Sequence, residues 1–516
     1  MSLRLMERAG EWPDRTALVT PEGTFTYGTL LRTSAGVAAR LLDGRADLEG
    51  DRVCFLVPPG WDYVACQWGI WRAGGIAVPL AVSHPPAELA YVLDDAEPVA
   101  VIAHPTLADR ILDAARERGI RVLSTEELPL GGGAAPAGPS RTGDGNHGPG
   151  GEPALPDIDE SRDAMMLYTS GTTGRPKGVV TTHANVRAQV EALVEAWGWR
   201  ADDRILLHLP LHHVHGIVNV LTCALWSGAT CEILPAFDAR EVWARLARGD
   251  LTLYMAVPTI YRRLIEAWES AGPDVRERWS RGAAACRLMV SGSAALPVPT
   301  LERWEDITGH RLLERYGMTE IGMALSNPLD GERRPGHVGR PLPSVELRLV
   351  DDAGEPAGPG EAGEIQVRGP AVFRAYWRRP DATSEAFSDD GWFRTGDRAV
   401  ENDGAYRILG RISVDILKTG GEKVSALEIE DVLRTHAGVR DCAVVGVPDP
   451  DWGERVCGAV VAADPDTPPD PSTLRDFLKE RLAPYKVPKE IRLLDDLPRN
   501  AMGKVQKPAI REMFER

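Results

Sequence analysis

Cysteine pairs with the spacing of a disulfide framework or a metal site are missing from this chain of 516 residues. Its seven cysteines are scattered, their number is odd and no C-x-x-C occurs. This pattern fits reduced thiols. The N-terminal segment also lacks the apolar core of a signal peptide, because Glu7, Glu11 and Asp14 interrupt it. Both absences predict a cytoplasmic protein.

Long hydrophobic runs and positive charge are scarce as well. No stretch reaches the ~18 uninterrupted apolar residues that a membrane helix needs. The 59 Lys and Arg face 75 Asp and Glu, a formal net charge of −16, so a broad phosphate-binding surface would form against the overall field. We therefore expect neither a membrane nor a nucleic acid as a partner.

Apolar runs that alternate with amphipathic stretches predict an α/β protein of more than one domain. The alternation stops at residues 131–150, which hold eight Gly and three Pro, and a flexible surface insertion is expected over about 130–158. It resumes at residue 163 and continues to about 409. The last hundred residues are expected to form a small unit of their own.

Within that small unit, capping signals predict two helices. Ser425 followed by Glu428 has the spacing of a capping box, and Gly438 is expected to end this helix. A strand over residues 443–447 should follow, and then a helix with Ser472 as its cap.

The segment YTSGTTGRPKG (residues 168–178) follows an apolar strand and has the composition of a phosphate-binding loop. Its glycines let the backbone approach an anion, its hydroxyls offer donors, and Lys177 adds positive charge. The spacing differs from a Walker loop, because Lys177 follows Gly174 by three residues. An ordinary Ser/Thr/Gly loop is the alternative for this segment taken alone.

This segment resembles the signature loop of the adenylate-forming superfamily, which includes acyl-CoA synthetases, luciferases and peptide-synthetase adenylation domains. Further motifs follow in the family's order: SGSA (291–294), RYGMTE (315–320), WFRTGD (392–397), GR (410–411), KTGGEK (418–423) and PRNAMGK (498–504). The resemblance implies an α/β fold. Residues 1–410 would form a large domain of stacked α/β subdomains with the ATP and acyl sites, and residues 411–516 a small mobile α+β lid domain.

The resemblance also implies a nucleotide site, with ATP, Mg²⁺ and CoA as cofactor and co-substrates. The residues expected to bind ATP or AMP are Thr169, Ser170, Gly171, Thr172, Thr173, Gly174, Lys177, Ser291, Gly292, Ser293, Arg315, Tyr316, Gly317, Met318, Asp397 and Arg411. Tyr316 would present its ring to adenine, and Asp397 would accept the ribose hydroxyls. Glu320 and Thr172 are expected to hold Mg²⁺.

The catalytic residues implied are Lys504, Thr319, Glu320 and His213, because activating a carboxylate at the α-phosphate depends on positioning and charge neutralisation. In the family the small domain rotates after this step, withdraws the lysine and brings a glycine loop to the thiol tunnel. CoA is accordingly expected at Gly420, Gly421 and Lys423. Two positions depart from the family pattern: Ser413 stands at the expected hinge, and Glu422 replaces an aromatic residue.

Four histidines in eight residues form a cluster that could also indicate a metal site: His208, His212, His213 and His215. No Cys or carboxylate lies near them in the sequence. The same run matches the family's apolar segment at the acyl pocket, where His213 would stand at the junction of adenylate and acyl group and His212 replaces a frequent Phe.

The acyl substrate is indicated by an arginine. Residues 257–268 should form a helix with Pro258 in its first turn, and Arg263 lies four residues after Thr259, on the side of the expected pocket mouth. Its guanidinium could bind a second carboxylate of the substrate. A solvent-exposed arginine is the alternative, and Arg333 or Arg334 could bind that carboxylate instead.

Residues 314–326, 333–336 and 411–421 resemble malonyl-CoA synthetases, including those that accept methylmalonate. The resemblance implies that malonate, ATP and CoA give malonyl-CoA, AMP and pyrophosphate, in a monomer or weak homodimer. Three alternatives remain: a CoA ligase for a short- or medium-chain or aryl monocarboxylate, a carrier-loading adenylation enzyme without a CoA step, and a non-enzymatic nucleotide-binding regulator.

Overall fold

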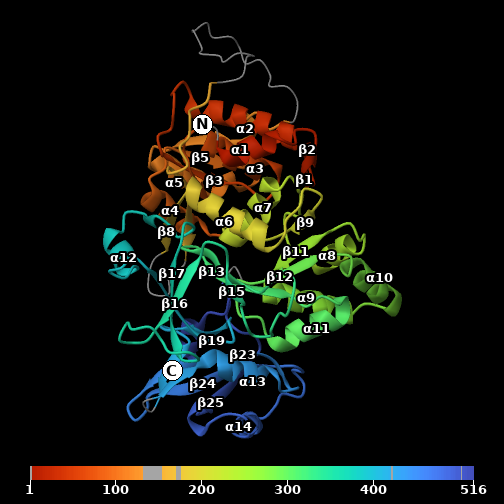
Figure 1. The fold of residues 1–516 in the computed structure, drawn as a ribbon, viewed down its shortest axis with the longest axis vertical. Coiled ribbons are helices and arrows are strands. Elements are labelled where there is room, and N and C mark those ends of the chain that lie inside the picture. Colours follow the sequence, from red (N-terminus) through yellow and green to blue (C-terminus); the bar gives the residue numbers. More distant parts are fainter. Residues whose placement is uncertain (1–2, 132–153, 170–175, 420–421, 501–502) are drawn as a thin grey trace.

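A computed structural model describes residues 3–131, 154–169, 176–419, 422–500 and 503–516. Figure 1 shows an elongated molecule in which the chain starts at one end and its last hundred residues, in blue, form a unit at the other end. The expected insertion over about residues 130–158 lies mostly outside the described residues, so its flexibility stays a prediction.

The largest sheet has nine strands with a parallel centre and antiparallel edges. Its order is β15 (Arg340–Pro341), β14 (Gly322–Ser326), β13 (Leu313–Met318), β12 (Leu288–Ser291), β11 (Leu253–Ala256), β9 (Arg204–Leu207), β10 (Thr230–Ile233), β1 (Thr16–Thr20) and β2 (Gly23–Thr26). The central strands are buried on both faces, as short apolar runs in a parallel sheet should be.

A second sheet of seven strands is parallel from β7 to β6 and antiparallel only at the edge formed by β8 and β18. Its order is β18 (Ala375–Tyr376), β8 (Lys177–Thr182), β7 (Asp163–Thr169), β4 (Ile76–Pro79), β3 (Arg52–Leu56), β5 (Ala100–Ala103) and β6 (Arg121–Ser124). The apolar runs at residues 53–57, 75–80 and 99–103 therefore become β3, β4 and β5.

The two sheets share one hydrophobic core. Successive side chains of a strand point to opposite faces, so only one face of each sheet contributes to this core. Phe55 and Leu207 belong to this shared core, whereas their neighbours Leu56 and Leu206 face outer layers. The helices that contribute to the shared core are α1 (Arg4–Gly10), α2 (Tyr27–Leu42), α3 (Trp61–Arg72), α6 (His183–Ala196) and α7 (Cys223–Trp226), with a π-helical segment at His215–Thr222.

Each outer face is covered by its own helices. Those on the nine-stranded sheet are α8 (Ala239–Leu246), α9 (Pro258–Glu269), α10 (Pro273–Ala283) and α11 (Val298–Thr308), and those on the seven-stranded sheet are α4 (Pro86–Ala96) and α5 (Leu112–Glu117). The short helix α12 (Pro380–Glu385) packs beside β18. This arrangement confirms the predicted stack of α/β subdomains.

A four-stranded antiparallel sheet connects these layers to the C-terminal unit. Its order is β16 (Glu346–Val350), β17 (Ala362–Arg368), β19 (Phe393–Asn402) and β20 (Ala405–Arg411). The next strand belongs to another sheet, β22 (Glu422–Ser425), β21 (Ile416–Thr419), β24 (Gly453–Ala462) and β23 (Val439–Asp449), with β25 (Glu490–Leu494) paired to β24. The chain passes from one sheet to the other between Arg411 and Ile416, and the domain boundary at 410/411 stays a prediction.

The C-terminal sheet has helices on both faces, α13 (Ala426–Arg434) and α14 (Pro471–Lys479) on one and α15 (Lys507–Glu515) on the other. Ser425 caps α13 as predicted, since its hydroxyl accepts the Glu428 amide hydrogen. Two details of the prediction were wrong. The helix α13 ends at Arg434, before Gly438, and Asp470 rather than Ser472 caps α14, because its carboxylate accepts the Ser472 amide hydrogen.

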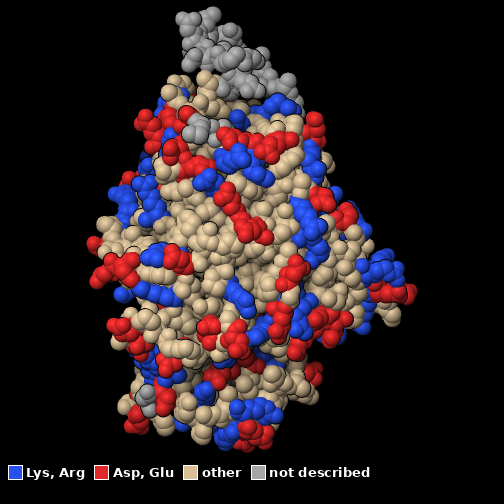
Figure 2. Space-filling model, in the orientation of Figure 1, with Lys and Arg blue, Asp and Glu red and all other residues tan. Residues whose placement is uncertain are grey.

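Charged side chains are interspersed over the surface. Figure 2 shows acidic and basic groups side by side on most of the visible face. Among the described helices, none is long and apolar enough to cross a membrane.

Candidate active site

The phosphate-loop residues that the structure describes lie at the adjacent ends of two antiparallel strands. Thr169 at the end of β7 faces Lys177 at the start of β8 in the antiparallel register, so the sheet fixes where the loop leaves and returns. Lys177 Nζ lies 4.5 Å from the centre of the Tyr376 ring. The loop residues Ser170, Gly171, Thr172, Thr173 and Gly174 lie outside the described residues.

Asp397 is the centre of a group that joins two sheets. The Tyr316 hydroxyl on β13 donates to Asp397 Oδ2 at 2.7 Å, and Arg411 binds the same carboxylate through Nε at 2.9 Å and Nη2 at 3.1 Å. Asp397 and Arg411 are register partners in β19 and β20. Three residues predicted to bind the nucleotide, Tyr316, Asp397 and Arg411, are thus brought together.

Glu320 lies just beyond this group, after β13. The Tyr376 hydroxyl donates to its Oε1 at 2.9 Å. Burial raises the pKa of Glu320, while the Tyr376 hydrogen bond and the positive charges of Arg411 and Lys177 oppose that shift. A carboxylate oxygen is the hard ligand that Mg²⁺ prefers, so Glu320 fits the predicted ion. Gly317 and Met318 are the last residues of β13, and Thr319 lies with Glu320 in the turn before β14.

The SGSA motif packs against Arg315. A Cβ added to Gly292 would lie 2.5 Å from Arg315 Cζ, so only glycine leaves room for this guanidinium. Ser293 Oγ is 3.3 Å from His215 Nδ1 and 3.4 Å from Arg315 Nη2. Burial lowers the pKa of Arg315 to about 9.

Several buried polar atoms of this region have no hydrogen-bond partner in the described part of the chain. They are His213 Nε2, His215 Nε2, Ser291 Oγ, Glu314 Oε2 and Arg315 Nε. Buried polar atoms in native proteins are nearly always paired, so a cluster of exceptions calls for a ligand or another explanation. Three of these atoms belong to predicted site residues, His213, Ser291 and Arg315.

The four histidines of the cluster have different surroundings in the structure. His208 Nε2 lies 2.8 Å from the Tyr254 hydroxyl in the outer core, whereas the rings of His212 and His213 lie side by side, 4.0 Å apart. Burial lowers the pKa of His212 to about 2 and of His213 to about 4. Within the described residues, no group of three or more His, Cys, Asp or Glu could hold a metal ion.

The predicted acyl helix is α9, with Pro258 as its first residue. Arg263 is exposed and stacks on Phe237 at 5.0 Å, and Arg262 pairs with Glu266 at 3.0 Å as its spacing predicts. The helical spacing of Ile260, Leu264 and Ala267 predicts one buried stripe, and this prediction was partly wrong. Leu264 is buried, but Ile260 and Ala267 are only half-buried, and the other buried residues of the helix are Pro258, Tyr261 and Ile265.

The two alternative arginines are already engaged elsewhere. Arg333 donates to three backbone carbonyls, those of Pro328, Arg311 and Leu329. Arg334 donates to the carbonyl of Asn402. Both side chains therefore serve local structure, which leaves Arg263 as the stronger candidate.

Lys504 comes from the C-terminal unit on a short hairpin. The Asn500 amide donates to the Lys504 carbonyl at 2.9 Å, and the Lys504 amide donates to Asn500 Oδ1 at 3.0 Å. A Cβ added to Gly503 would lie 3.6 Å from Thr259 Oγ1, so the hairpin meets the first turn of α9. The Lys504 residue is exposed to solvent, although many protein atoms surround it. Partial desolvation and the charge of Arg411 lower the pKa of Lys504, and the charges of Asp415 and Asp397 oppose this shift.

The expected CoA residues are less well defined. Lys423 forms an ion pair with Asp352 of the large part. Gly420 and Gly421 lie outside the described residues. Ser413 and Glu422 are exposed.

Sequence reasoning missed four residues of this region: Glu314, Tyr376, Asp415 and Lys507. Glu314 is buried with one unpartnered oxygen, and burial raises its pKa to about 8. A charged residue between the apolar Leu313 and the RYGMTE motif was the signal for it. Tyr376 carried no local signal, because only the fold brings it to Glu320.

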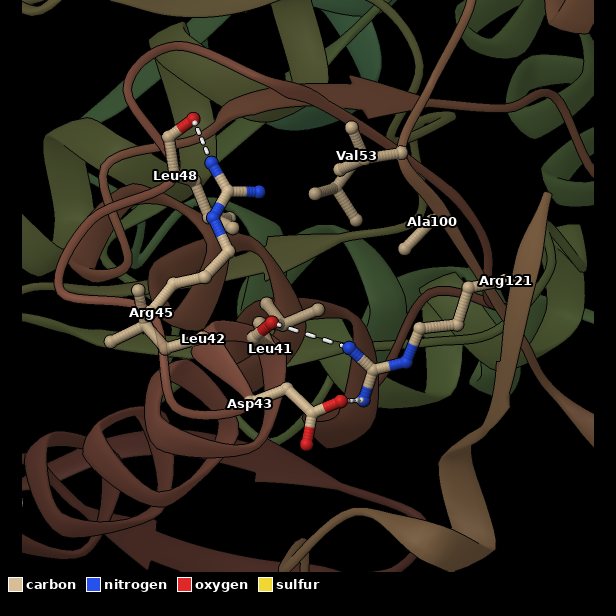
Figure 3. Close-up of a pocket in the computed structure, with 9 residues that line it drawn as sticks. Leu41, Leu42, Asp43, Arg45, Leu48, Val53, Ala100 and Arg121 are labelled. Atoms are coloured by element: carbon tan, nitrogen blue, oxygen red, sulfur yellow. Dashed lines mark hydrogen bonds and ion pairs between the residues drawn. The ribbon is translucent and has the colours of Figure 1, made fainter. Parts of the chain in front are cut away.

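A cavity of about 250 Å³ lies away from all these residues. Leu41, Leu48, Val53 and Ala100 form its apolar wall, with Arg45 and Arg121 on opposite sides (Figure 3). Both guanidiniums are paired locally, Arg45 with Asp51 and Arg121 with Asp43. The cavity contains none of the predicted site residues.

Two family models match most of the chain. The model of the AMP-binding enzyme family matches residues 5–377, and that of the AMP-binding enzyme C-terminal domain matches residues 428–504. The chain is 44% identical to human malonate–CoA ligase ACSF3, mitochondrial, covering 99% of this chain and 92% of that protein. The Xenopus laevis protein of the same name is 46% identical, covering 98% of this chain and 90% of that protein.

Two solved structures are informative because they differ in what they hold. ATP-bound MatB from Rhodopseudomonas palustris has a TM-score of 0.89 at 36% identity, covering 100% of this chain and 99% of that one. A malonyl-CoA ligase with methylmalonyl-CoA and AMP bound has a TM-score of 0.66 at 39% identity, covering 94% and 97%.

Proposed function

Since the chain belongs to the AMP-binding enzyme family, we propose that it is a malonate–CoA ligase. It would convert malonate, ATP and CoA to malonyl-CoA, AMP and pyrophosphate through a malonyl-adenylate. The observation that carries the proposal is the meeting of the Lys504 hairpin with Thr259, one helical turn before Arg263. The relatives named malonate–CoA ligases, at 44–46% identity over nearly the whole chain, support the choice of acid.

In the first half-reaction, the malonate carboxylate attacks the α-phosphate of ATP and pyrophosphate leaves. Tyr316 and Asp397 would hold the adenosine, with Asp397 accepting the ribose hydroxyls. Lys177 would bind phosphate oxygens, and Glu320 would hold Mg²⁺, which neutralises phosphate charge when bound. Lys504 would stabilise the charge that develops between the reacting carboxylate and the phosphate, the place where fixed positive charge is most effective.

The second carboxylate of malonate would be bound by Arg263. Residues four apart share a helix face, so Arg263 lies on the side of α9 that the Lys504 hairpin reaches. A guanidinium binds a carboxylate through two parallel hydrogen bonds. This charge would select a short dicarboxylate over a fatty acid, and methylmalonate, which keeps both carboxylates, would also be accepted.

In the second half-reaction, the CoA thiol attacks the acyl carbonyl and AMP leaves. The small unit would rotate between the two steps, withdrawing Lys504 and bringing the segment of Gly420, Gly421 and Lys423 to the thiol. Two relatives of similar sequence identity support this assignment. The TM-score is 0.89 to the ATP-bound relative but only 0.66 to the one that holds a CoA thioester. The present arrangement would then be that of adenylation.

Acid-dependent pyrophosphate release tests the proposal. We would assay malonate, methylmalonate, acetate, butyrate, octanoate and coumarate with ATP and Mg²⁺, each with and without CoA. Release confined to malonate and methylmalonate, with malonyl-CoA formed only when CoA is present, is expected. A preference for a monocarboxylate would reject the dicarboxylate assignment, and turnover indifferent to CoA would indicate another acceptor, such as a carrier.

The cellular location and oligomeric state belong to the same proposal. We infer a cytoplasmic monomer or weak homodimer. The ACSF3 relatives are named mitochondrial, so cell fractionation would test the location. The molecular mass from sedimentation equilibrium would give the oligomeric state.

A further inference from the structure

The passage between the four-stranded sheet and the C-terminal unit is a tight turn closed by one carboxylate. The Asp415 amide donates to the Arg411 carbonyl at 2.7 Å, and the Arg411 amide donates to Asp415 Oδ2 at 3.0 Å. Gly410 has a φ of +122°, and a Cβ there would lie 2.4 Å from Asp415 Cβ. The turn therefore needs a glycine at 410 to admit Asp415.

The other oxygen of Asp415 binds a buried lysine. Lys507 Nζ lies 2.5 Å from Asp415 Oδ1 and 2.7 Å from Glu430 Oε1. The Lys507 side chain is 11% exposed and that of Glu430 only 4%. Burial alone would lower the pKa of Lys507, but Glu430 and Asp415 together hold it above its usual value. A buried lysine between two carboxylates is charged and strongly held.

Asp415 and Lys507 connect the proposed nucleotide residues to the Lys504 hairpin. Lys507 is the first residue of α15, three residues after Lys504, so it anchors the base of the Lys504 hairpin. On the other side, the Arg411 amide binds Asp415 while the Arg411 guanidinium binds Asp397. One chain of contacts thus runs from the nucleotide residue Asp397 to the hairpin of Lys504.

We propose that Asp415 and Lys507 are positioning residues for the first half-reaction. They hold the 411–415 turn in its present form and set the base of the Lys504 hairpin, so that Lys504 faces the nucleotide residues only while this turn is closed. The inference rests on the proposed two-step reaction. Removing Lys507 takes away the cation that Asp415 and Glu430 share, and removing the Asp415 charge leaves Lys507 with Glu430 alone. Loss of one member of a buried ionic group is unfavourable, so the closed arrangement should be lost before the fold is.

The test separates the two half-reactions. Adenylation is followed as pyrophosphate released in a single turnover without CoA, and thioester formation as malonyl-CoA made from supplied malonyl-adenylate and CoA. We expect Lys507→Met to slow adenylation at least about tenfold and thioester formation less than about twofold. Lys507→Arg, which keeps a charge able to reach both carboxylates, should restore adenylation to within about threefold of wild type.

The C-terminal unit supplies a matched control. Lys486 binds both oxygens of Glu428 at 2.7 Å within the same unit. Lys486→Met removes a similar ion pair and should change neither half-reaction more than about twofold. Asp415→Asn is the second test variant, for the case that Lys507→Met does not fold: its amide oxygen still accepts from Arg411, but the charge facing Lys507 is gone, and adenylation alone should fall.

Equal losses in both half-reactions, or no loss of adenylation in either variant, would overturn the inference. These outcomes are separable from failure of the proposed function, because the ratio of half-reactions is measured with whichever acid the wild-type enzyme activates. A wild type that rejects malonate but shows the split with another acid would reject the substrate and keep the positioning role.

Discussion

The large part of the molecule and its C-terminal unit supply site residues in different ways. In the large part, strand register holds them: Thr169 faces Lys177, and Asp397 faces Arg411. In the C-terminal unit, Lys504 stands on a hairpin that touches the large part at Thr259. Sheets of many strands resist deformation, whereas a hairpin docked by a few contacts can leave and return.

This difference suggests a division of labour. Residues fixed by the sheets should serve both half-reactions, because nucleotide and acyl group stay bound throughout. Residues of the C-terminal unit should serve one half-reaction each. The predictions below are arranged by the size of the effect expected from this division.

Lys504→Ala should have the largest effect. We expect adenylate formation to fall about 300-fold or more, since one fixed charge at a developing oxyanion contributes ~10²–10³ in rate. Thioester formation from supplied malonyl-adenylate should stay within about twofold of wild type. Single-turnover pyrophosphate release and malonyl-CoA formation measure the two steps. If both steps fell together, Lys504 would not be specific to adenylation and the comparison between the two regions would fail.

Arg263→Ala tests a residue of the large part. The KM for malonate should rise about 30-fold, the scale of a lost charge-assisted contact, while the KM for ATP stays unchanged. The rate of thioester formation from supplied malonyl-adenylate should also fall, in contrast to Lys504→Ala. In the wild type, Arg263 would still bind the free carboxylate of the acyl group during this second step.

The neighbouring Arg262→Ala is the control for Arg263. It removes an arginine of the same helix that is bound to Glu266 and should leave both KM values within about twofold of wild type. An unchanged malonate KM in Arg263→Ala would mean that the second carboxylate is bound elsewhere.

The sequence predicted much of this geometry because the motifs encode local structure. The apolar runs became strands, Ser425 capped its helix, and Pro258 opened α9. The sequence could not place Tyr376 on Glu320 or Lys507 on Asp415, since these pairs are 56 and 92 residues apart and meet only through the packing of sheets. The cap at Asp470 was missed because two capping residues stand close together, and backbone geometry selects between them.

The pH dependence of adenylation should report the charges around Lys504. Its pKa is lowered by desolvation, Arg411 and Lys507, and supported by Asp415 and Asp397. Protonated Lys504 is the active form, so the rate should fall as pH rises through this lowered pKa, earlier than for an ordinary lysine. Asp415→Asn removes one supporting charge and should move the alkaline limb to still lower pH.

Glu428→Gln serves as the control for this shift. It neutralises a carboxylate of the same unit that is bound to Lys486 and should leave the alkaline limb of adenylation in place. A limb that moves equally in both variants would reflect the overall charge of the unit rather than the surroundings of Lys504.

Lys423→Ala should have the smallest effect. The ion pair of Lys423 with Asp352 joins the two regions, but the two side chains are 38% and 67% exposed, and exposed pairs contribute ~0–1 kcal/mol. We expect adenylation to fall less than about threefold, with the deficit disappearing at high salt because screening already weakens the pair in wild type. Asp352→Asn should match it in adenylation. If Lys423 also binds CoA, Lys423→Ala alone should raise the KM for CoA, whereas equal CoA dependence in the two variants would limit Lys423 to docking the unit.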